Sequence, residues 1–228
     1  MRIFANCKEA TSEIKRDLKE MGVEVKLNRM QDKDIKDDPD YYTLELRGYS
    51  YAILDTSDKD YLLEMFGKKK DWAEAEFSER ISLQNLNPGE AWKLRDDVWR
   101  EFLHSGKLAY TYSERIKEQA EKIIDEFSVN PTTRQAYLSI WDPNIDIDKM
   151  GKERVPCSLG YHFMIRDGEM ECRYMIRSND LFTHFAYDVW LAIALQEYIA
   201  NAVGVEVGRF EHYICSLHAY RKDLKGIF

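Results

Sequence analysis

Three side chains between residues 155 and 220 have the types and the order needed for covalent chemistry on a phosphorylated ligand. Cys157 supplies a thiol, Arg177 opens the basic turn 177–180, and Asp188 follows as a lone carboxylate. A thiolate is a strong nucleophile, a guanidinium binds phosphate through paired donors, and a carboxylate can read the hydrogen-bonding edge of a heterocycle. These groups suit covalent chemistry on the pyrimidine ring of a nucleotide, and Asp188 would then select the pyrimidine.

The elements around these residues must place them at strand and helix ends. Residues 159–165 and 170–176 alternate as strands around Asp167-Gly168, a hairpin signal, so Cys157 is expected at the hairpin entry. Residues 185–203 are apolar around the whole helical circumference, which predicts a buried central helix. Taken alone, Asp188 near the start of this helix fits a helix cap as well as it fits a functional carboxylate.

The remaining patterns predict a mixture of helices and strands in one domain spanning residues 1–228. Of the 228 residues, 44% are hydrophobic and 13% aromatic, enough for a substantial core. The segment 31–40 is charged and reads as a loop. Periodicity predicts helices over 8–21, 59–66, 70–80, 92–102 and 114–127, and strands over 23–27, 42–46, 136–141 and 211–217.

Composition and charge exclude several classes of protein. The formal net charge is −8, which is unfavourable for coating duplex nucleic acid and gives an RNA-binding role no support. No secretory signal and no apolar run of about 18 residues is present, which predicts a cytoplasmic protein. The four cysteines lack metal-ligand and Cys-x-x-Cys spacing, so we expect reduced thiols, no metal site and no disulfide framework.

Five motifs in series resemble the thymidylate synthase family. They are Asn130-Pro131-Thr132-Thr133-Arg134, Trp141-Asp142-Pro143, Pro156-Cys157, Arg177-Ser178-x-Asp180 with an acid eight residues beyond, and His218-x-Tyr220. The match covers roughly half the chain, from Tyr110 to Tyr220, and each motif alone would be weak. The resemblance implies an α+β fold in which a mixed sheet forms the interface of a homodimer around a buried central helix.

The resemblance also implies a role for each matching residue. Cys157 would add to C6 of the pyrimidine, and 5,10-methylenetetrahydrofolate would supply the one-carbon unit. Asp180 would face the base and the folate. The other assignments follow the motifs: Arg177, Ser178 and Arg134 for the 5′-phosphate, with Arg134 coming from the partner subunit; His218 and Tyr220 for the sugar; Trp99 for the folate.

The catalytic glutamate of the family is expected on the helix 70–80. Ala73-Glu74-Ala75-Glu76-Phe77 looks like the segment that carries it, which favours Glu74. The alignment needs a gap of one residue, so Glu76 stays a competitor. In the family this side chain moves protons to and from the ring through water.

Asp188 departs from the asparagine that usually reads uracil in this family. Cytosine presents an N3 acceptor and an N4 amino donor, and an aspartate that accepts from N4 and shares a proton with N3 matches both. A mismatched base would leave a polar group unpaired, at a cost of about 1–3 kcal/mol. An aspartate at this position resembles the phage deoxycytidylate hydroxymethylases. Two further features are similar to the same enzymes, Asn179 and the run Ser216-Leu217-His218-Ala219-Tyr220.

We therefore predict an enzyme that transfers a hydroxymethyl group to cytosine of dCMP or CMP. The runner-up is thymidylate synthase or another pyrimidine nucleotide 5-methyltransferase, and a catalytically idle nucleotide-binding homologue is disfavoured by Cys157. Departures from the synthases include Gln135 in place of a second phosphate-loop arginine and Ser158 in place of a histidine. Lys36 and Arg47 are candidates for an N-terminal phosphate ligand. Ribose and deoxyribose stay equally possible.

Overall fold

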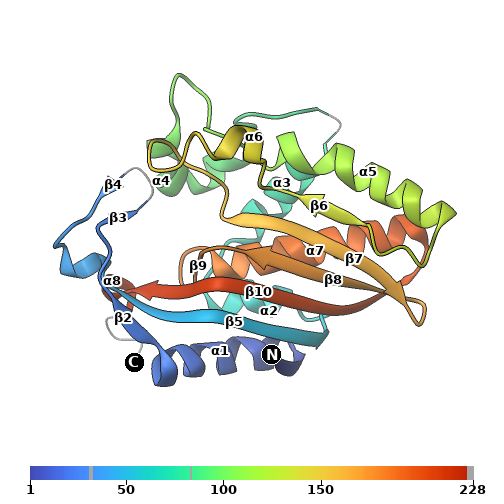
Figure 1. Ribbon diagram of the computed structural model, residues 1–228, viewed down its shortest axis with the longest axis horizontal. Helices are drawn as coiled ribbons and strands as arrows, with labels where there is room; N and C mark the ends of the chain where they lie inside the picture. Colours follow the sequence, from blue (N-terminus) through green and yellow to red (C-terminus); the bar gives the residue numbers. More distant parts are fainter. Residues whose placement is uncertain (31–32, 83, 225–228) are drawn as a thin grey trace.

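The computed structural model describes residues 1–30, 33–82 and 84–224 and is built around one mixed sheet of eight strands (Figure 1). The strand order is β1-β5-β10-β8-β7-β6, with β2 paired to β5 and β9 paired to β10. β10 runs antiparallel to β5 but parallel to β8. The strands are β1 (Arg2–Asn6), β2 (Val23–Val25), β5 (Thr43–Asp55), β6 (Tyr137–Ser139), β7 (Ser158–Arg166), β8 (Glu169–Ile176), β9 (Asn179–Asp180) and β10 (Glu206–Tyr220); β3 (Arg29–Met30) and β4 (Lys33–Asp34) form a separate pair.

The hairpin of β7 and β8 forms as predicted. Asp167 and Gly168 have φ of 53° and 85°, the left-handed values that a tight two-residue turn requires. The pairing continues to the open end, where Ser158 lies opposite Ile176. Cys157 and Arg177 follow directly, and the Arg177 backbone N–H donates to the Cys157 carbonyl at 2.9 Å. A turn ten residues away thus brings the thiol and the guanidinium together.

The central helix is α7 (Phe185–Val203), with the bounds expected from the sequence. It packs against β8 and β10 and lies behind the sheet in Figure 1, with buried residues on every side. Gly204 ends the helix at φ 80°, a conformation that costs glycine little. The predicted buried helix is therefore confirmed.

The other helices follow the amphipathic segments closely. α1 packs against β5, and α5 packs against β6 and α7. The segment 92–102 is helical but broken into short turns. The helices are α1 (Cys7–Met21), α2 (Asp60–Met65), α3 (Lys70–Arg80), α4 (Asp96–Trp99), α5 (Ser113–Val129), α6 (Pro143–Asp146) and α8 (Arg221–Leu224), with 3₁₀ turns η1 (Pro39–Tyr41), η2 (Ala91–Arg95) and η3 (Arg100–Phe102).

Several strands differ from expectation; β10, for example, spans Glu206–Tyr220 where residues 211–217 were expected. β1 was not predicted, and β5 continues to Asp55 although the expected strand stopped before Gly48. Gly48 adopts φ 62° within the strand and so bends it without ending it. The expected loop 31–40 contains β4 and part of η1, and its residues 31–32 lie outside the described residues. No described helix has the length and apolar character to cross a membrane.

Candidate functional site

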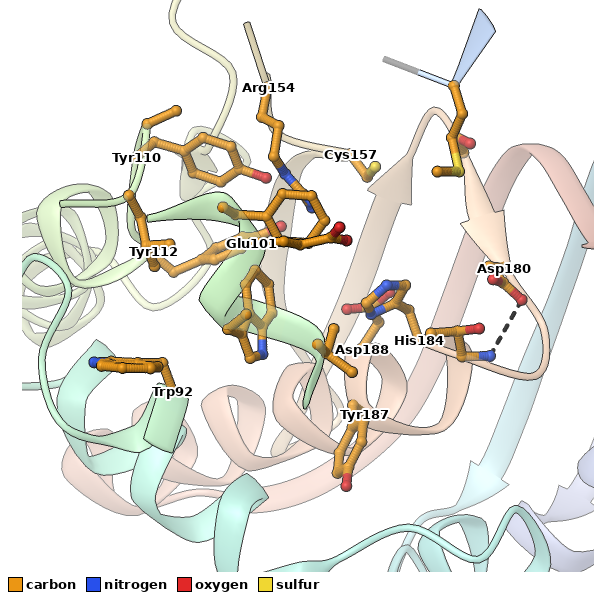
Figure 2. A pocket seen from close by; sticks show the side chains of 18 of the residues that line it. Trp92, Glu101, Tyr110, Tyr112, Arg154, Cys157, Asp180, His184, Tyr187 and Asp188 are labelled. Atoms are coloured by element: carbon orange, nitrogen blue, oxygen red, sulfur yellow. Dashed lines mark hydrogen bonds between the residues drawn. The ribbon is translucent and has the colours of Figure 1, made fainter. Parts of the chain in front are cut away.

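A cavity of about 660 Å³ opens where β8 and β10 end and α7 begins. Because β8 and β10 are parallel, their carboxyl ends deliver residues to the same edge of the sheet. The volume lies within the roughly 300–1,000 Å³ typical of small-molecule sites. Figure 2 shows the side chains of Cys157, Arg154, His184 and Asp188 around this space.

Cys157 lines the cavity and is half-buried. Burial raises the pKa of its thiol, while the positive charges of Arg177 and Arg154 oppose that rise. The neighbouring carboxylates Asp188 and Asp180 add to it. Burial in this cavity therefore favours the thiol over the thiolate, and a bound ligand or a nearby base must assist deprotonation before the sulfur can attack.

Asp188 projects from the first turn of α7 into the same cavity. Burial raises its carboxyl pKa to about 7, against the lowering effects of Arg80, Asn179 and Arg95. The Asn179 side chain donates from Nδ2 to Asp188 Oδ2 at 2.6 Å. A carboxyl group with this pKa holds its proton for much of the time at neutral pH, so it can both donate and accept a hydrogen bond.

The turn after β8 brings three predicted residues to the cavity, Arg177, Ser178 and Asp180. Arg177 is oriented by two carbonyls, since its Nε donates to Pro156 at 3.0 Å and its Nη2 to Val155 at 3.2 Å. Asp180 Oδ1 accepts from the backbone N–H groups of Phe182 and Thr183, which shapes the turn into α7. The guanidinium is thereby held at the cavity wall, beside the thiol.

The end of β10 places His218 and Tyr220 in the cavity, both nearly buried at 7% and 8% exposure. Ser216 and Glu45 line the same region, and their side chains are hydrogen-bonded to each other. Hydroxyl, imidazole and carboxylate groups form a polar patch here. Such a patch is suited to hydrogen-bonding the hydroxyl groups of a sugar.

The structure separates the two candidate glutamates on α3. Glu76 lines the cavity, with a side chain 20% exposed and an ion pair of 2.9 Å to Arg80. Glu74 lies outside it, 60% exposed, with Lys70 at 3.7 Å. Of the two, Glu76 is the one placed to reach a ligand beside Cys157.

Trp99 lines the cavity as expected and stacks on Trp72, with ring centroids 6.4 Å apart. Sequence reasoning missed two basic neighbours of this wall, Arg154 and His184. Arg154 lies over the Phe102 ring at 3.5 Å, and burial lowers the pKa of His184 to about 4. Both come from irregular segments without a motif, so only their proximity to Cys157 or Asp188 in the chain could have drawn attention to them.

Arg134 is not among the residues that line the cavity, and it is exposed. Its carbonyl accepts a hydrogen bond from His162 at the β7 edge. Neither Lys36 nor Arg47 lines the cavity, whereas Arg29 and Lys33 of the small β3–β4 sheet do. Among the residues that the structure describes, no group of three or more His, Cys, Asp or Glu side chains is arranged to hold a metal ion.

Comparison with known proteins places the chain in a family. The family model for thymidylate synthase matches residues 67–227. A putative thymidylate synthase of Methanocaldococcus jannaschii is 34% identical over 119 residues, 51% of this chain and 54% of the relative. A deoxyuridylate hydroxymethyltransferase of Pseudomonas phage M6 is 34% identical over 120 residues, 49% of this chain and 32% of the relative. The alignments thus span about half or less of these curated relatives.

Solved structures agree on the fold. The thermostable thymidylate synthase A of Bacillus subtilis superposes with a TM-score of 0.74 at 16% identity, covering 97% of this chain and 82% of that one. The T4 phage thymidylate synthase superposes with a TM-score of 0.69 at 21% identity, covering 96% of this chain and 79% of that one. The chain belongs to the thymidylate synthase family and has its fold, as the motifs implied. Methylenetetrahydrofolate is the co-substrate of this family.

Proposed function

We propose that this protein transfers a hydroxymethyl group from 5,10-methylenetetrahydrofolate to C5 of the cytosine in dCMP or CMP. The observation that carries the proposal is the position of Asp188, whose carboxyl lies in one cavity with the thiol of Cys157 and whose pKa is raised by burial to about 7. A protonated carboxyl can donate to N3 of cytosine and accept from its N4 amino group. The asparagine usual in the family presents the pattern that suits uracil.

In the proposed reaction the Cys157 sulfur forms a bond to C6, which makes C5 nucleophilic. C5 then attacks the one-carbon unit of the folate, Glu76 assists loss of the C5 proton through water, and tetrahydrofolate departs. Water adds to the exocyclic methylene carbon that remains. The C6–S bond then breaks, releasing the thiolate and the 5-hydroxymethyl nucleotide.

The binding assignments follow the walls of the cavity. Arg177 and Ser178 would hold the 5′-phosphate, with Arg29 and Lys33 as added positive charge from the β3–β4 sheet. His218 and Tyr220 would hold the sugar, and Trp99 with Asp180 would face the folate. Arg134 would enter the site of a partner subunit in a homodimer, in keeping with its position outside the cavity of its own chain.

The relative from Pseudomonas phage M6 supports hydroxymethyl transfer as the reaction type. Its name states deoxyuridylate as its substrate, so it gives no support for cytosine. That part of the proposal rests on Asp188.

The test is tritium release from C5 of labelled dCMP, CMP and dUMP with methylenetetrahydrofolate, followed by mass analysis of the product. We expect release from a cytosine nucleotide and a 5-hydroxymethyl product. Formation of dihydrofolate, followed by absorbance, would instead indicate methyl transfer. Release from dUMP alone would refute the cytosine assignment.

Three variants control this experiment. Cys157→Ala should abolish release because no covalent adduct forms. Glu76→Gln should slow it by about 10²-fold or more, the usual contribution of a general acid–base group. Glu74→Gln, the same change two residues away and outside the cavity, should leave the rate within about twofold. A larger loss of the release rate with Glu74→Gln than with Glu76→Gln would make Glu74 the catalytic glutamate.

A further inference from the structure

Asn179 is a buried side chain that reaches from the sheet to the central helix. It lies on β9, is 1% exposed, and is held by pairing with Leu217 of β10. Its amide donates to Asp188 Oδ2 at 2.6 Å. Because β9 is fixed by the sheet and Asp188 by α7, this contact fixes one particular oxygen of the carboxyl group as an acceptor.

A neutral carboxyl group alone is ambiguous toward the two pyrimidines. Its hydroxyl oxygen donates and its carbonyl oxygen accepts, and moving the proton from one oxygen to the other reverses that order. Cytosine requires a donor toward N3 and an acceptor toward N4, whereas uracil requires the reverse. Asp188 can discriminate between them only if the position of its proton is set by the protein.

The charged groups that face Asp188 leave this choice to Asn179. The charges of Arg80 on α3 and Arg95 on η2 lower the pKa of Asp188, but the Arg80 Nε donates its hydrogen bond to Glu76 at 2.9 Å. The Arg95 guanidinium lies 4.4 Å from the centroid of the Tyr187 ring. Its other titratable neighbours are Asp180 of β9, the Cys157 thiol and four buried tyrosines, Tyr110, Tyr112, Tyr161 and Tyr174. A guanidinium bound directly to Asp188 would hold it ionised, with two acceptor oxygens, whereas an amide donor leaves room for a proton.

We propose that Asn179 is the positioning residue that confines the proton of Asp188 to Oδ1 and keeps Oδ2 as the acceptor for the amino group of cytosine. This inference rests on the proposed function, because it explains how that site distinguishes its base. Asn179 therefore has no contact with the reacting atoms and acts through Asp188. Its loss should relax the choice of base more than it slows the chemistry.

The experiment compares tritium release from dCMP, CMP and dUMP by the full-length protein and by Asn179→Ala. We expect the ratio of kcat/KM for the better cytosine nucleotide over dUMP to fall about tenfold, the effect of one lost hydrogen bond that orients a polar group. Gln196→Ala is the matched control. Gln196 is also a buried amide, on α7, but it donates to the backbone carbonyls of Met170 and Gly208 outside the cavity. Its loss should leave the ratio unchanged.

A second measurement follows the carboxyl carbon of Asp188 directly by ¹³C NMR during a pH titration. Asn179 donates to the ionised form, so Asn179→Ala should raise the Asp188 pKa above its value of about 7. Asn179→Ser, which keeps a donor, provides a milder variant if the alanine protein does not fold. An unchanged ratio with an unchanged pKa would overturn the inference and leave the proposed function intact. Wild-type release from dUMP alone would refute the proposed function, while the effect of Asn179 on the Asp188 pKa would still be measurable.

Discussion

Two aspartates, Asp188 and Asp146, show how the partner of a carboxyl group determines its use. Burial disfavours the charged form of both. At Asp146, whose side chain is 1% exposed, burial is opposed by Arg115, which donates at 2.6 and 2.9 Å, by the backbone N–H of Asp142 and by the charge of Lys149, and together these lower the pKa. At Asp188 the side chain that donates a hydrogen bond is the neutral amide of Asn179. Burial outweighs the groups that favour the charged form, and the pKa rises to about 7. The first carboxyl is a structural anion, and the second can exchange a proton with a ligand.

The same substitution, aspartate to asparagine, should have opposite consequences at the two positions. Asp146→Asn leaves the Arg115 guanidinium without its counter-charge, so we expect the free energy of unfolding to fall by about 3–5 kcal/mol. Urea denaturation measures this loss. Base preference should not change, because Asp146 lies outside the cavity.

Asp188→Asn should change the free energy of unfolding by less than about 1 kcal/mol, since burial disfavours the charged form of this carboxyl and the amide that replaces it is neutral and of similar shape. It should instead lower the ratio of kcat/KM for the cytosine nucleotide over kcat/KM for dUMP by about 10²-fold, the effect of mispairing two polar groups in the site. A strongly destabilised Asp188→Asn protein with its cytosine preference intact would make Asp188 a structural residue like Asp146.

The sequence predicted much of the frame that holds Asp188. The turn at Asp167-Gly168 and the apolar segment 185–203 were local signals, and their elements formed with nearly the expected bounds. The motif order also indicated the family correctly. A hairpin register and a helix packed on a sheet then suffice to bring Cys157, Arg177 and Asp188 into one cavity.

Contacts between distant elements could not be predicted in the same way. Glu74 and Glu76 are two residues apart on a helix and so point in different directions, and only the packing of α3 determines which one meets the cavity. The hydrogen bond from Asn179 to Asp188 depends on the position of β9 relative to α7. β1 was missed because its pairing with β5 joins residues about fifty positions apart.

A pH dependence should also distinguish Asp188 from Asp146. In the proposed function the protonated carboxyl reads cytosine, and burial raises the pKa of this carboxyl to about 7. At higher pH the proton is lost, so kcat/KM for the cytosine nucleotide should acquire a limb that falls by up to about tenfold per pH unit. Asp188→Asn should abolish this limb and leave the rising limb of the Cys157 thiol, whose pKa is raised by burial. Initial rates measured between pH 5.5 and about 9 with both proteins would separate the two groups, and a falling limb that persists in Asp188→Asn would assign it to another residue.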